Sequence, residues 1–314
     1  YMTIIYILIT RPFGLLLMFL YNLIGSYGLS IIAFTFIVRL LLLPLNVKSR
    51  RSTMAMSKIQ PKLLELQAKY RNDKMKLNEE MQKLYQENNI SPMSGCLPTL
   101  IQLPILIGLY GCIQKPLTFM MGLNTSNIQL IANKLGVEYA ANNAQAEITL
   151  AGLIYENFEK VAHLSNEIAA NLVPVDFHFL GFDLTATPSI SHPSMLWILP
   201  ILSGLTAFLS SFIMQKLQKP KPEPEPDDGK KKKKKKQQQP PKDPQSSSMK
   251  AMMVVMPLMS VYFGFMLPAC LAVYWITGNI LVIVQELILS KYFAWERKKQ
   301  AAQVQSLAQT QKEK

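Results

Sequence analysis

A single arginine interrupts the most apolar stretch of the chain. Arg39 lies inside the run from Ile31 to Leu45, whose other residues are uncharged. On insertion scales, a charged side chain at the centre of a membrane-spanning helix costs about 2.5–3.5 kcal/mol. Such a residue normally faces a water-filled cavity or a polar partner. Lipid is therefore not expected to cover this segment on every side.

Several further apolar blocks approach the length of a membrane span. Hydrophobic residues make up 49% of the 314 positions, and the mean hydropathy is positive. A helix needs roughly 17–25 residues to cross the hydrocarbon core. The sequence therefore predicts an all-α integral membrane protein with five transmembrane helices. The predicted spans are residues 28–46, 94–115, 195–215, 251–267 and 268–290.

The segments that connect these spans differ in charge. Residues 47–93 hold ten basic and five acidic side chains, residues 216–250 hold twelve and five, and residues 291–314 hold six and two. Residues 116–194 instead hold two basic and seven acidic ones. Because Lys- and Arg-rich loops stay in the cytoplasm, we predict an outside N-terminus, a cytoplasmic C-terminus and an extracytoplasmic loop at 116–194. The net charge of +13 then reflects topology, and no DNA partner is expected.

Residues 1–27 are apolar but interrupted. Arg11, Pro12 and Gly14 break the run, and Gly25 separates it from the first predicted span. This pattern favours a helix lying in the membrane interface. A retained signal segment is the alternative.

Residues 47–93 read as a cytoplasmic helical hairpin. Pro44 and Asn46 are expected to close the first span, Pro61 to fall early in the first hairpin helix, and Arg71–Asp73 to form the turn. The apolar positions recur at helical spacing. They are Ile59, Leu63, Leu66, Tyr70, Leu77, Met81 and Leu84.

The outer loop and the two basic segments have distinct patterns. A long amphipathic helical pattern precedes an aromatic, extended stretch expected at the outer membrane interface. The first set is Leu150, Ile154, Val161 and Ile168, and the second is Phe177, Phe179, Phe182 and Leu184.

Residues 216–250, with seven lysines at Lys230–Lys236, are predicted to be disordered. The basic tail at 291–314 carries Arg297, Lys298 and Lys299, which either bind a partner or simply flank the last span.

No pattern of residues indicates covalent catalysis. The chain has no phosphate-binding glycine loop, and His163, His178 and His192 are widely separated. We therefore expect no enzyme activity, no cofactor and no metal. Of the three cysteines, Cys112 and Cys270 fall near outer helix ends, which leaves a disulfide between them as a geometric alternative.

Isolated polar residues mark the predicted spans. Thr35 lies one turn before Arg39 and extends a polar strip, unless its hydroxyl only bonds its own helix. Gln102 is expected in the same cavity, with a bond between helices as the alternative. Trp275, Asn279 and Glu286 share one face of the last span, and Glu286 is a possible charge partner of Arg39. In the third span, small residues predict close helix packing: Ser203, Gly204, Thr206, Ala207 and Ser211.

Several motifs in order resemble the YidC/Oxa family of membrane protein insertases. They are TFIVR at 35–39 with LPL at 43–45, GCLP at 95–98 with LIQLP at 100–104, and PACLAVYWITGN at 268–279. The resemblance covers about residues 25–115 and 177–292. It is to compact bacterial members without the large periplasmic domain, although the outer loop at 124–172 is longer than usual in them.

The resemblance implies five helices around a hydrophilic groove that opens to the cytoplasm and to lipid. The family's groove arginine falls at Arg39, and Thr35, Gln102 and Trp275 match groove or substrate-contacting positions; we place Asn279 there too. The hairpin matches an element that receives substrates, and the basic tail resembles ribosome-contacting tails.

The function that follows is insertion and folding of newly made proteins in the bacterial cell membrane, alone or with the Sec translocon. Nascent membrane proteins and the ribosome are the expected partners, and anionic lipids are possible ones. The alternatives are a secondary transporter in which Arg39 binds an anionic solute, and a Sec-associated scaffold without insertase activity.

Overall fold

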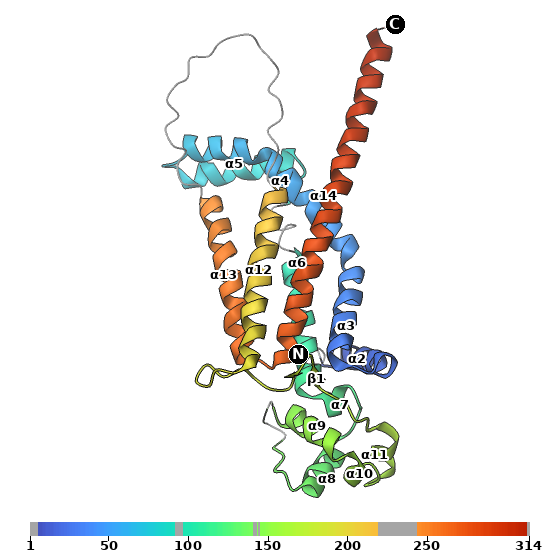
Figure 1. Ribbon diagram of the computed structural model, residues 1–314. Coiled ribbons are helices and arrows are strands. Elements are labelled where there is room, and N and C mark those ends of the chain that lie inside the picture. Colours follow the sequence, from blue (N-terminus) through green and yellow to red (C-terminus); the bar gives the residue numbers. More distant parts are fainter. Residues whose placement is uncertain (1–5, 92–96, 141–142, 144, 219–243, 313–314) are drawn as a thin grey trace. The chain divides into compact units, whose positions relative to one another are not determined.

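The computed structural model of the chain is almost wholly helical (Figure 1). It describes residues 6–91, 97–140, 143, 145–218 and 244–312. The helical content agrees with the predicted all-α membrane class. By their contacts, the residues form two compact units. Unit 1 comprises Tyr1–Leu43, Cys96–Ala207 and Met256–Asn279, and unit 2 comprises Pro44–Gly95, Phe208–Val255 and Ile280–Lys314.

Among the described residues, two helical stretches are long and apolar enough to cross a membrane. They are Met195–Leu217 and Ala269–Gln300. A third joins them if α3 (Tyr27–Leu41) and α4 (Leu43–Lys69) count as one broken span. Three further apolar helical stretches are shorter, with 10–17 residues each. They are Leu8–Ile24, Leu100–Gln114 and Val254–Met266.

The break between α3 and α4 differs from the predicted end of the first span. The helix stops at Leu41, earlier than Asn46, and resumes at Leu43 after the single residue Leu42. Pro44 explains the break because it has no N–H to donate to the carbonyl of Leu40, while a proline is tolerated in the first turn of the next helix. Pro61 consequently lies well inside the 27-residue α4 instead of near its start.

In unit 1, the N-terminal region is a π-helix, η1 (Tyr6–Thr10), followed by α2 (Arg11–Ile24). Pro12 and Gly14, which interrupt the apolar run in the sequence, both lie within the continuous helix α2. Pro12 occupies the first turn of α2, where it fits. A Cβ on Gly14 would lie 2.2 Å from the carbonyl oxygen of Phe119, so this glycine allows α2 to touch α7 (Pro116–Phe119). Gly25 ends α2 with a φ of 74°.

The two cysteines that the structure describes are buried free thiols. Cys112 lies on α6 (Leu97–Gln114) and Cys270 on α14 (Ala269–Lys312). The alternative of a disulfide between them is therefore wrong. The Cys112 thiol instead donates to the carbonyl oxygen of Thr10, 2.8 Å away, and so links α6 to η1.

The outer segment of unit 1 is a group of short helices (Figure 1). They are α7, α8 (Thr125–Leu135), α9 (Ala146–Glu156), α10 (Phe158–Val161) and α11 (Asn166–Asn171). The predicted apolar positions Leu150, Ile154, Val161 and Ile168 are all buried. They belong to three helices instead of one long helix, because the chain turns at Asn157 and again before Ser165, which caps α11.

A buried glutamate holds this outer group together. Glu147 accepts hydrogen bonds from the backbone N–H of Thr118 at 3.0 Å, from its hydroxyl at 2.9 Å, and from the Tyr139 hydroxyl at 3.4 Å. Burial raises the pKa of Glu147, and the bonds from Thr118 and the charge of Lys115 only partly oppose it. Burial beside Glu147 also raises the pKa of Tyr139 to about 12.

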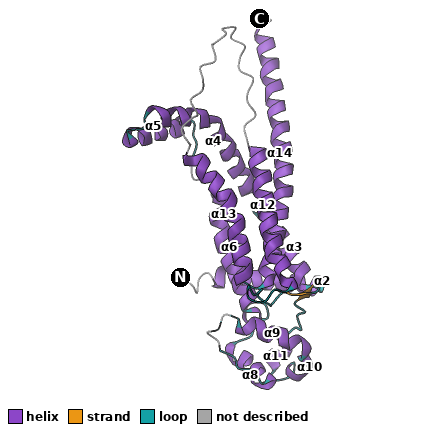
Figure 2. Ribbon diagram, turned by 60° about the vertical axis from the view of Figure 1, so that its left-hand side comes forward, coloured by secondary structure: helices purple, strands orange, loops and turns teal. Residues whose placement is uncertain are grey.

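The aromatic stretch after α11 forms a small hairpin of β1 (His178–Phe179) and β2 (Phe182–Asp183) (Figure 2). His178 pairs with Asp183 and Phe179 with Phe182. Phe177 and Leu184 are buried beneath it. The backbone N–H of Cys270 donates to the carbonyl oxygen of Leu184 at 3.0 Å, so the hairpin is attached to the first turn of α14.

Close packing of the next helices is confirmed in unit 1. The 3-10 turn η3 (Met195–Trp197) leads into α12 (Ile198–Gln218), and α13 (Pro244–Met266) follows. A Cβ on Gly204 of α12 would lie 2.3 Å from a Val261 methyl of α13, and a Cβ on Gly264 of α13 would lie 2.9 Å from Pro200. Side chains larger than glycine do not fit at either contact.

In unit 2, α4 and α5 (Lys74–Glu87) form the predicted pair of helices. Residues 70–73 separate them, and Asp73 caps α5 by accepting from the Lys76 N–H at 3.0 Å. The buried cluster between them is small. It consists of Ile59, Leu63, Leu84 and Ile90. So few buried contacts are typical of a weakly packed element.

The C-terminal region departs from the predicted end of the last span. Helix α14 continues to Lys312, so the basic residues Arg297, Lys298 and Lys299 lie on the same helix as the apolar segment. Its Ala-, Gln- and Lys-rich sequence explains the continuation, because these residues favour helix. The Lys230–Lys236 run and Cys96 lie outside the described residues.

Raising the pH is predicted to destabilise the outer helical group through Glu147. The folded group holds the proton more tightly than the unfolded chain, so its contribution to stability is fully present below about pH 4.3 and is lost as the pH rises toward the raised pKa. Hydrogen exchange of α9 amides, corrected for intrinsic rates, should show this loss in the wild type and a flatter profile in Glu147→Gln. The exposed Glu156 on the same helix supplies the control, Glu156→Gln. Parallel profiles in all three proteins would contradict the assignment.

Candidate functional site

The polar strip predicted on the first span lies on α3 in unit 1. Thr35 is buried, and its hydroxyl donates to the carbonyl oxygen of Ile31 at 2.6 Å. This is the local bond within its own helix that the sequence left open. Arg39 follows one turn later and is half-buried. Residues four apart lie on one helical face, so the small side chain of Thr35 is on the same face as the guanidinium.

Helix α14 approaches Arg39 through a glycine. A Cβ on Gly278 would lie 3.2 Å from Nη2 of Arg39, and 4.0 Å from both Nε of Arg39 and Cγ2 of Thr35. Tyr274, one turn earlier on α14, lies within electrostatic reach of Arg39. The Tyr274–Gly278 face of α14 therefore borders the Thr35–Arg39 face of α3.

Helix α6 joins this cluster through Gln102. Its side-chain N–H donates to the hydroxyl oxygen of Tyr274 at 2.6 Å. The amide thus makes the bond between helices that was one of its two predicted roles, and it makes that bond to the residue beside Arg39. We call Thr35, Arg39, Gln102, Tyr274 and Gly278 the arginine cluster. It draws one or two residues from each of three helices.

Trp275 and Asn279 face other neighbours. The Trp275 ring lies 6.2 Å from that of Phe263 on α13. The Asn279 amide donates to the Thr206 hydroxyl at 3.2 Å and lies 3.5 Å from the carbonyl oxygen of Ser203, both on α12. Adjacent positions on α14 thus serve two faces: Tyr274 and Gly278 border α3 and α6, while Trp275 and Asn279 contact α12 and α13.

Arg39 has no carboxylate within ion-pair distance among the described residues. Its neighbours in the arginine cluster are neutral: a hydroxyl, an amide, a phenol and a glycine backbone. A guanidinium presents five donors and stays charged at any physiological pH. Chemically, this arrangement is suited to binding an anionic group or water.

A second polar cluster lies in unit 2 and contains an arginine that the sequence analysis did not single out. Nη2 of Arg50 on α4 lies 3.4 Å from a carboxylate oxygen of Glu286 on α14, and it donates to the carbonyl oxygen of Leu217 at 3.2 Å. Asn46, one turn before Arg50 on α4, donates to Gln285, the residue next to Glu286 on α14, at 3.3 Å. Glu286, considered above as a partner of Arg39, thus lies in an ion pair with Arg50. The four-residue spacing of Asn46 and Arg50 was the available signal.

The Arg50–Glu286 pair is almost fully buried, with side chains 4% and 9% exposed. Two other guanidinium nitrogens of Arg50, Nε and Nη1, have no hydrogen-bond partner. A second pair, Arg51 with Glu296 at 3.2 Å, is much more exposed.

Farther along α14, the ammonium of Lys299 lies 5.6 Å from the centre of the Trp295 ring, and Arg297 and Lys298 are exposed.

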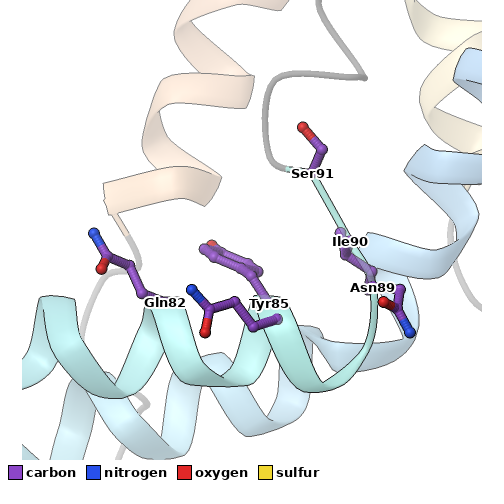
Figure 3. A pocket seen from close by; sticks show the side chains of 6 residues that line it. Gln82, Tyr85, Asn89, Ile90 and Ser91 are labelled. Carbon is purple, nitrogen blue, oxygen red and sulfur yellow. The ribbon is translucent and has the colours of Figure 1, made fainter.

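An open depression lies at the end of α5 in unit 2. Figure 3 shows Gln82 and Tyr85 on α5 and the residues that follow the helix. Its lining carries no charge and consists of Gln82, Tyr85, Gln86, Asn89, Ile90 and Ser91. Among the described residues, no group of three or more His, Cys, Asp or Glu side chains is placed to hold a metal. Neither the uncharged depression nor the arrangement of the described His, Cys, Asp and Glu side chains indicates a reactive site in addition to the arginine cluster.

Comparison with known proteins gives consistent matches. The family model described as "60Kd inner membrane protein" matches residues 19–298. A protein of Listeria monocytogenes named membrane protein insertase YidC 1 is 29% identical over 91% of this chain and 71% of its own length. Proteins named membrane protein insertase YidC from Oceanobacillus iheyensis and Clostridium perfringens are 31% and 32% identical, over 85% and 83% of this chain and 75% and 77% of theirs.

The buried pair Arg50–Glu286 is predicted to show strong energetic coupling. Removing one member leaves the other charge buried, which typically costs about 3–5 kcal/mol, while replacing both by apolar residues costs far less. Thermal or denaturant unfolding of Arg50→Met, Glu286→Leu and the double variant should therefore be far from additive. The exposed pair Arg51–Glu296 is the matched control, with a coupling of about 1 kcal/mol or less. Additive effects at Arg50 and Glu286 would contradict this.

Proposed function

This chain belongs to the YidC/Oxa family of membrane protein insertases, and on that premise we propose that it inserts newly made proteins into the bacterial cell membrane. The observation that carries the mechanism is the arginine cluster. A permanent positive charge lies among neutral neighbours, with no carboxylate within ion-pair distance among the described residues. An inserting protein that brings an acidic segment would supply the missing anion.

In the proposed topology five helices cross the bilayer: α3, α6, α12, α13 and α14. The N-terminus lies outside and the C-terminus in the cytoplasm, following the Lys and Arg distribution. Large exposed apolar side chains along α12 and α13 support this placement, because a water-soluble surface rarely carries so many. They include Ile201, Leu205, Phe208, Leu258, Met259 and Tyr262.

Helix α2 is proposed to lie in the outer membrane interface. One side is buried in unit 1 through Leu17 and Tyr21, and the opposite side exposes Leu15, Phe19 and Leu23. A helix that is apolar on both sides and not surrounded by protein is explained by lipid contact on the exposed side. Water is an unfavourable neighbour for the side of α2 that exposes Leu15, Phe19 and Leu23.

The proposed groove is centred on the arginine cluster and opens to the cytoplasm. Water in it would solvate the guanidinium, whose burial in lipid alone would cost several kcal/mol. The proposed span α3 is short, with 15 residues, about 22 Å at helical rise. A span shorter than the roughly 30 Å hydrocarbon core thins the bilayer locally. Water and thinning together lower the barrier for a polar segment.

The driving force is then hydrophobic. Arg39 attracts acidic residues in the segment that must reach the outer side, and the apolar helix of the inserting protein moves from the groove into lipid. Burying about twenty apolar residues is favourable by tens of kcal/mol at about 25 cal/mol per Å². This exceeds the cost of moving a short polar tail, so no nucleotide hydrolysis is required.

The remaining partners are proposals from charge and position. The α4–α5 hairpin, with its small buried cluster, is mobile enough to receive clients. Arg297, Lys298 and Lys299 are exposed on α14 and suited to ribosomal RNA or anionic lipid. Cooperation with the Sec translocon would use the lipid-facing helices.

Reconstitution of the protein alone in liposomes distinguishes the three functional classes. An insertase should integrate a small single-span client, measured by protease protection, without Sec components. Integration only after adding the Sec translocon would support a scaffold. Uptake of an anionic solute without client integration would support a transporter, and either of these outcomes would contradict the proposal.

Replacing Arg39 is predicted to act on clients according to their charge. Arg39→Ala should lower the insertion of a client with an acidic outer tail at least several-fold, because the attracting charge is lost. Arg39→Lys should retain most of it, since charge and not bidentate geometry is invoked. The same client with a neutralised tail serves as the control and should be affected little. Normal insertion of the acidic client by the Ala variant would contradict the role of charge.

Enlarging Gly278 is predicted to impair the same clients without removing any charge. The side chain of Gly278→Leu would occupy the space of the Arg39 guanidinium, now 3.2 Å from the position of a Cβ. Gly278→Ala is the matched control, since the end of the flexible arginine can shift by a few tenths of an ångström. We expect a clear insertion defect for Leu and a small one for Ala. Equal activity in both variants would show that the position of Arg39 against α14 is unimportant.

A further inference from the structure

The turn of the small hairpin in unit 1 combines backbone strain with an exposed apolar side chain. Leu180 and Gly181 connect β1 to β2, and both have positive φ, 52° and 83°. Two-residue turns of this kind favour Asn-Gly or Gly-Gly, because a leucine in the left-handed region is strained. Leu180 is nevertheless 80% exposed. A residue that is unfavourable for the backbone and contacts little protein is explained by a partner outside the chain.

The hairpin that carries this turn is firmly held by the outer ends of α2 and α3. A Cβ on Gly28 would lie 2.2 Å from the Phe179 ring, so only glycine lets this ring pack on the first turn of α3. The Tyr27 and Phe177 rings meet edge to face at 4.7 Å. The Tyr21 hydroxyl of α2 accepts from the Asp176 N–H at 3.0 Å and lies 3.2 Å from the carbonyl oxygen of Pro174. The turn is therefore presented on a fixed support.

Several exposed apolar side chains lie near this support, together with the exposed His178 and the partly exposed Asp176, which contact each other at 3.0 Å. The hairpin lies beside α2 (Figure 2), whose outward side exposes Leu15, Phe19 and Leu23. Leu29 is exposed at the start of α3. The turn sequence Phe179–Phe182 carries no charge. Leu180 thus adds one more exposed apolar side chain to this region, and the partner that fits such side chains at the end of a spanning helix is the lipid of the outer leaflet.

We propose that the Leu180 turn inserts into the outer leaflet and fixes the depth of α3, and with it the depth of Arg39. Arg39 lies eleven residues beyond Gly28, about 16 Å along the helix at 1.5 Å per residue. Half of a hydrocarbon core of about 30 Å is about 15 Å. A hairpin held at the outer interface therefore places the guanidinium about 16 Å below that interface. This inference rests on the proposed function only in that α3 spans the membrane.

The first test measures lipid contact at the turn. Leu180→Cys, in a Cys96→Ser background that retains the buried Cys112 and Cys270, would be labelled with an environment-sensitive fluorophore in liposomes that contain shallow brominated lipids. The unsubstituted background measures stray labelling. Strong quenching by the brominated lipid is expected at position 180, as at Leu23→Cys on α2. A probe at Leu130→Cys, an exposed leucine of α8 in the outer helical group, is the matched control.

Quenching at position 180 that is as weak as at position 130, with ready access to aqueous iodide, would overturn the proposal. Quenching at neither 180 nor 23, with intact insertion activity, would overturn it as well. Loss of insertion activity is not used as a readout, so failure of the proposed function would show in the liposome insertion assay and not here.

The second test asks whether the turn sets depth. Leu180→Asn suits the left-handed backbone better than leucine, so a turn without a lipid role should become at least as stable and leave α3 unchanged. The proposal predicts instead that a probe at Leu29→Cys becomes less quenched by shallow brominated lipids and more accessible to iodide. Leu180→Met, which keeps an apolar tip, should preserve the wild-type depth. An unchanged depth profile in the Asn variant, with its fold intact by circular dichroism, would overturn the depth-setting role.

Discussion

The guanidinium of Arg39 on an otherwise apolar helix is the constraint on which the rest of the site depends. Its immediate neighbours are Thr35, Tyr274 and Gly278, and none of them carries a compensating charge. A half-buried cation in an apolar segment, without a counter-ion, requires solvation from water or from a bound anion. The structure leaves room for the guanidinium by placing a glycine opposite it, and it joins the surrounding helices by the bond from Gln102 to Tyr274. The cluster is thus held by neutral contacts that leave the charge available.

Arg50 is also removed from solvent, but its charge is paired with a carboxylate. It lies only eleven residues after Arg39 in the sequence, yet it is buried in an ion pair with Glu286 and donates to the carbonyl oxygen of Leu217. One arginine is neutralised and joins α4 to α14, while the other has no carboxylate within ion-pair distance among the described residues. We interpret the first as structural and the second as functional. Helix α14 contributes to both clusters and also contacts α12 and α13 through Asn279 and Trp275.

Some residues of the arginine cluster could be selected from the sequence and others could not. Arg39 and Gln102 were recognisable because polar side chains are conspicuous in apolar segments. Tyr274 and Gly278 were not, because a tyrosine or a glycine in a span has no meaning until the partner helix is placed. The role of Gly14 could not be predicted for the same reason, since this glycine allows contact with Phe119 on another helix. The break at Leu42 and the division of the apolar positions 150–168 among three short helices depend on local backbone bonds that hydrophobic periodicity does not report.

The most direct measurement of the central claim is the water accessibility of the arginine cluster from each side of the membrane. A cysteine at position 102, in the Cys96→Ser background, would be challenged with a membrane-impermeant maleimide in oriented vesicles. Labelling from the cytoplasmic side and not from the outer side is the predicted result, because the groove is proposed to open inward. A position 102 thiol that reacts from neither side, or only from outside, in a protein that still inserts clients would contradict the account.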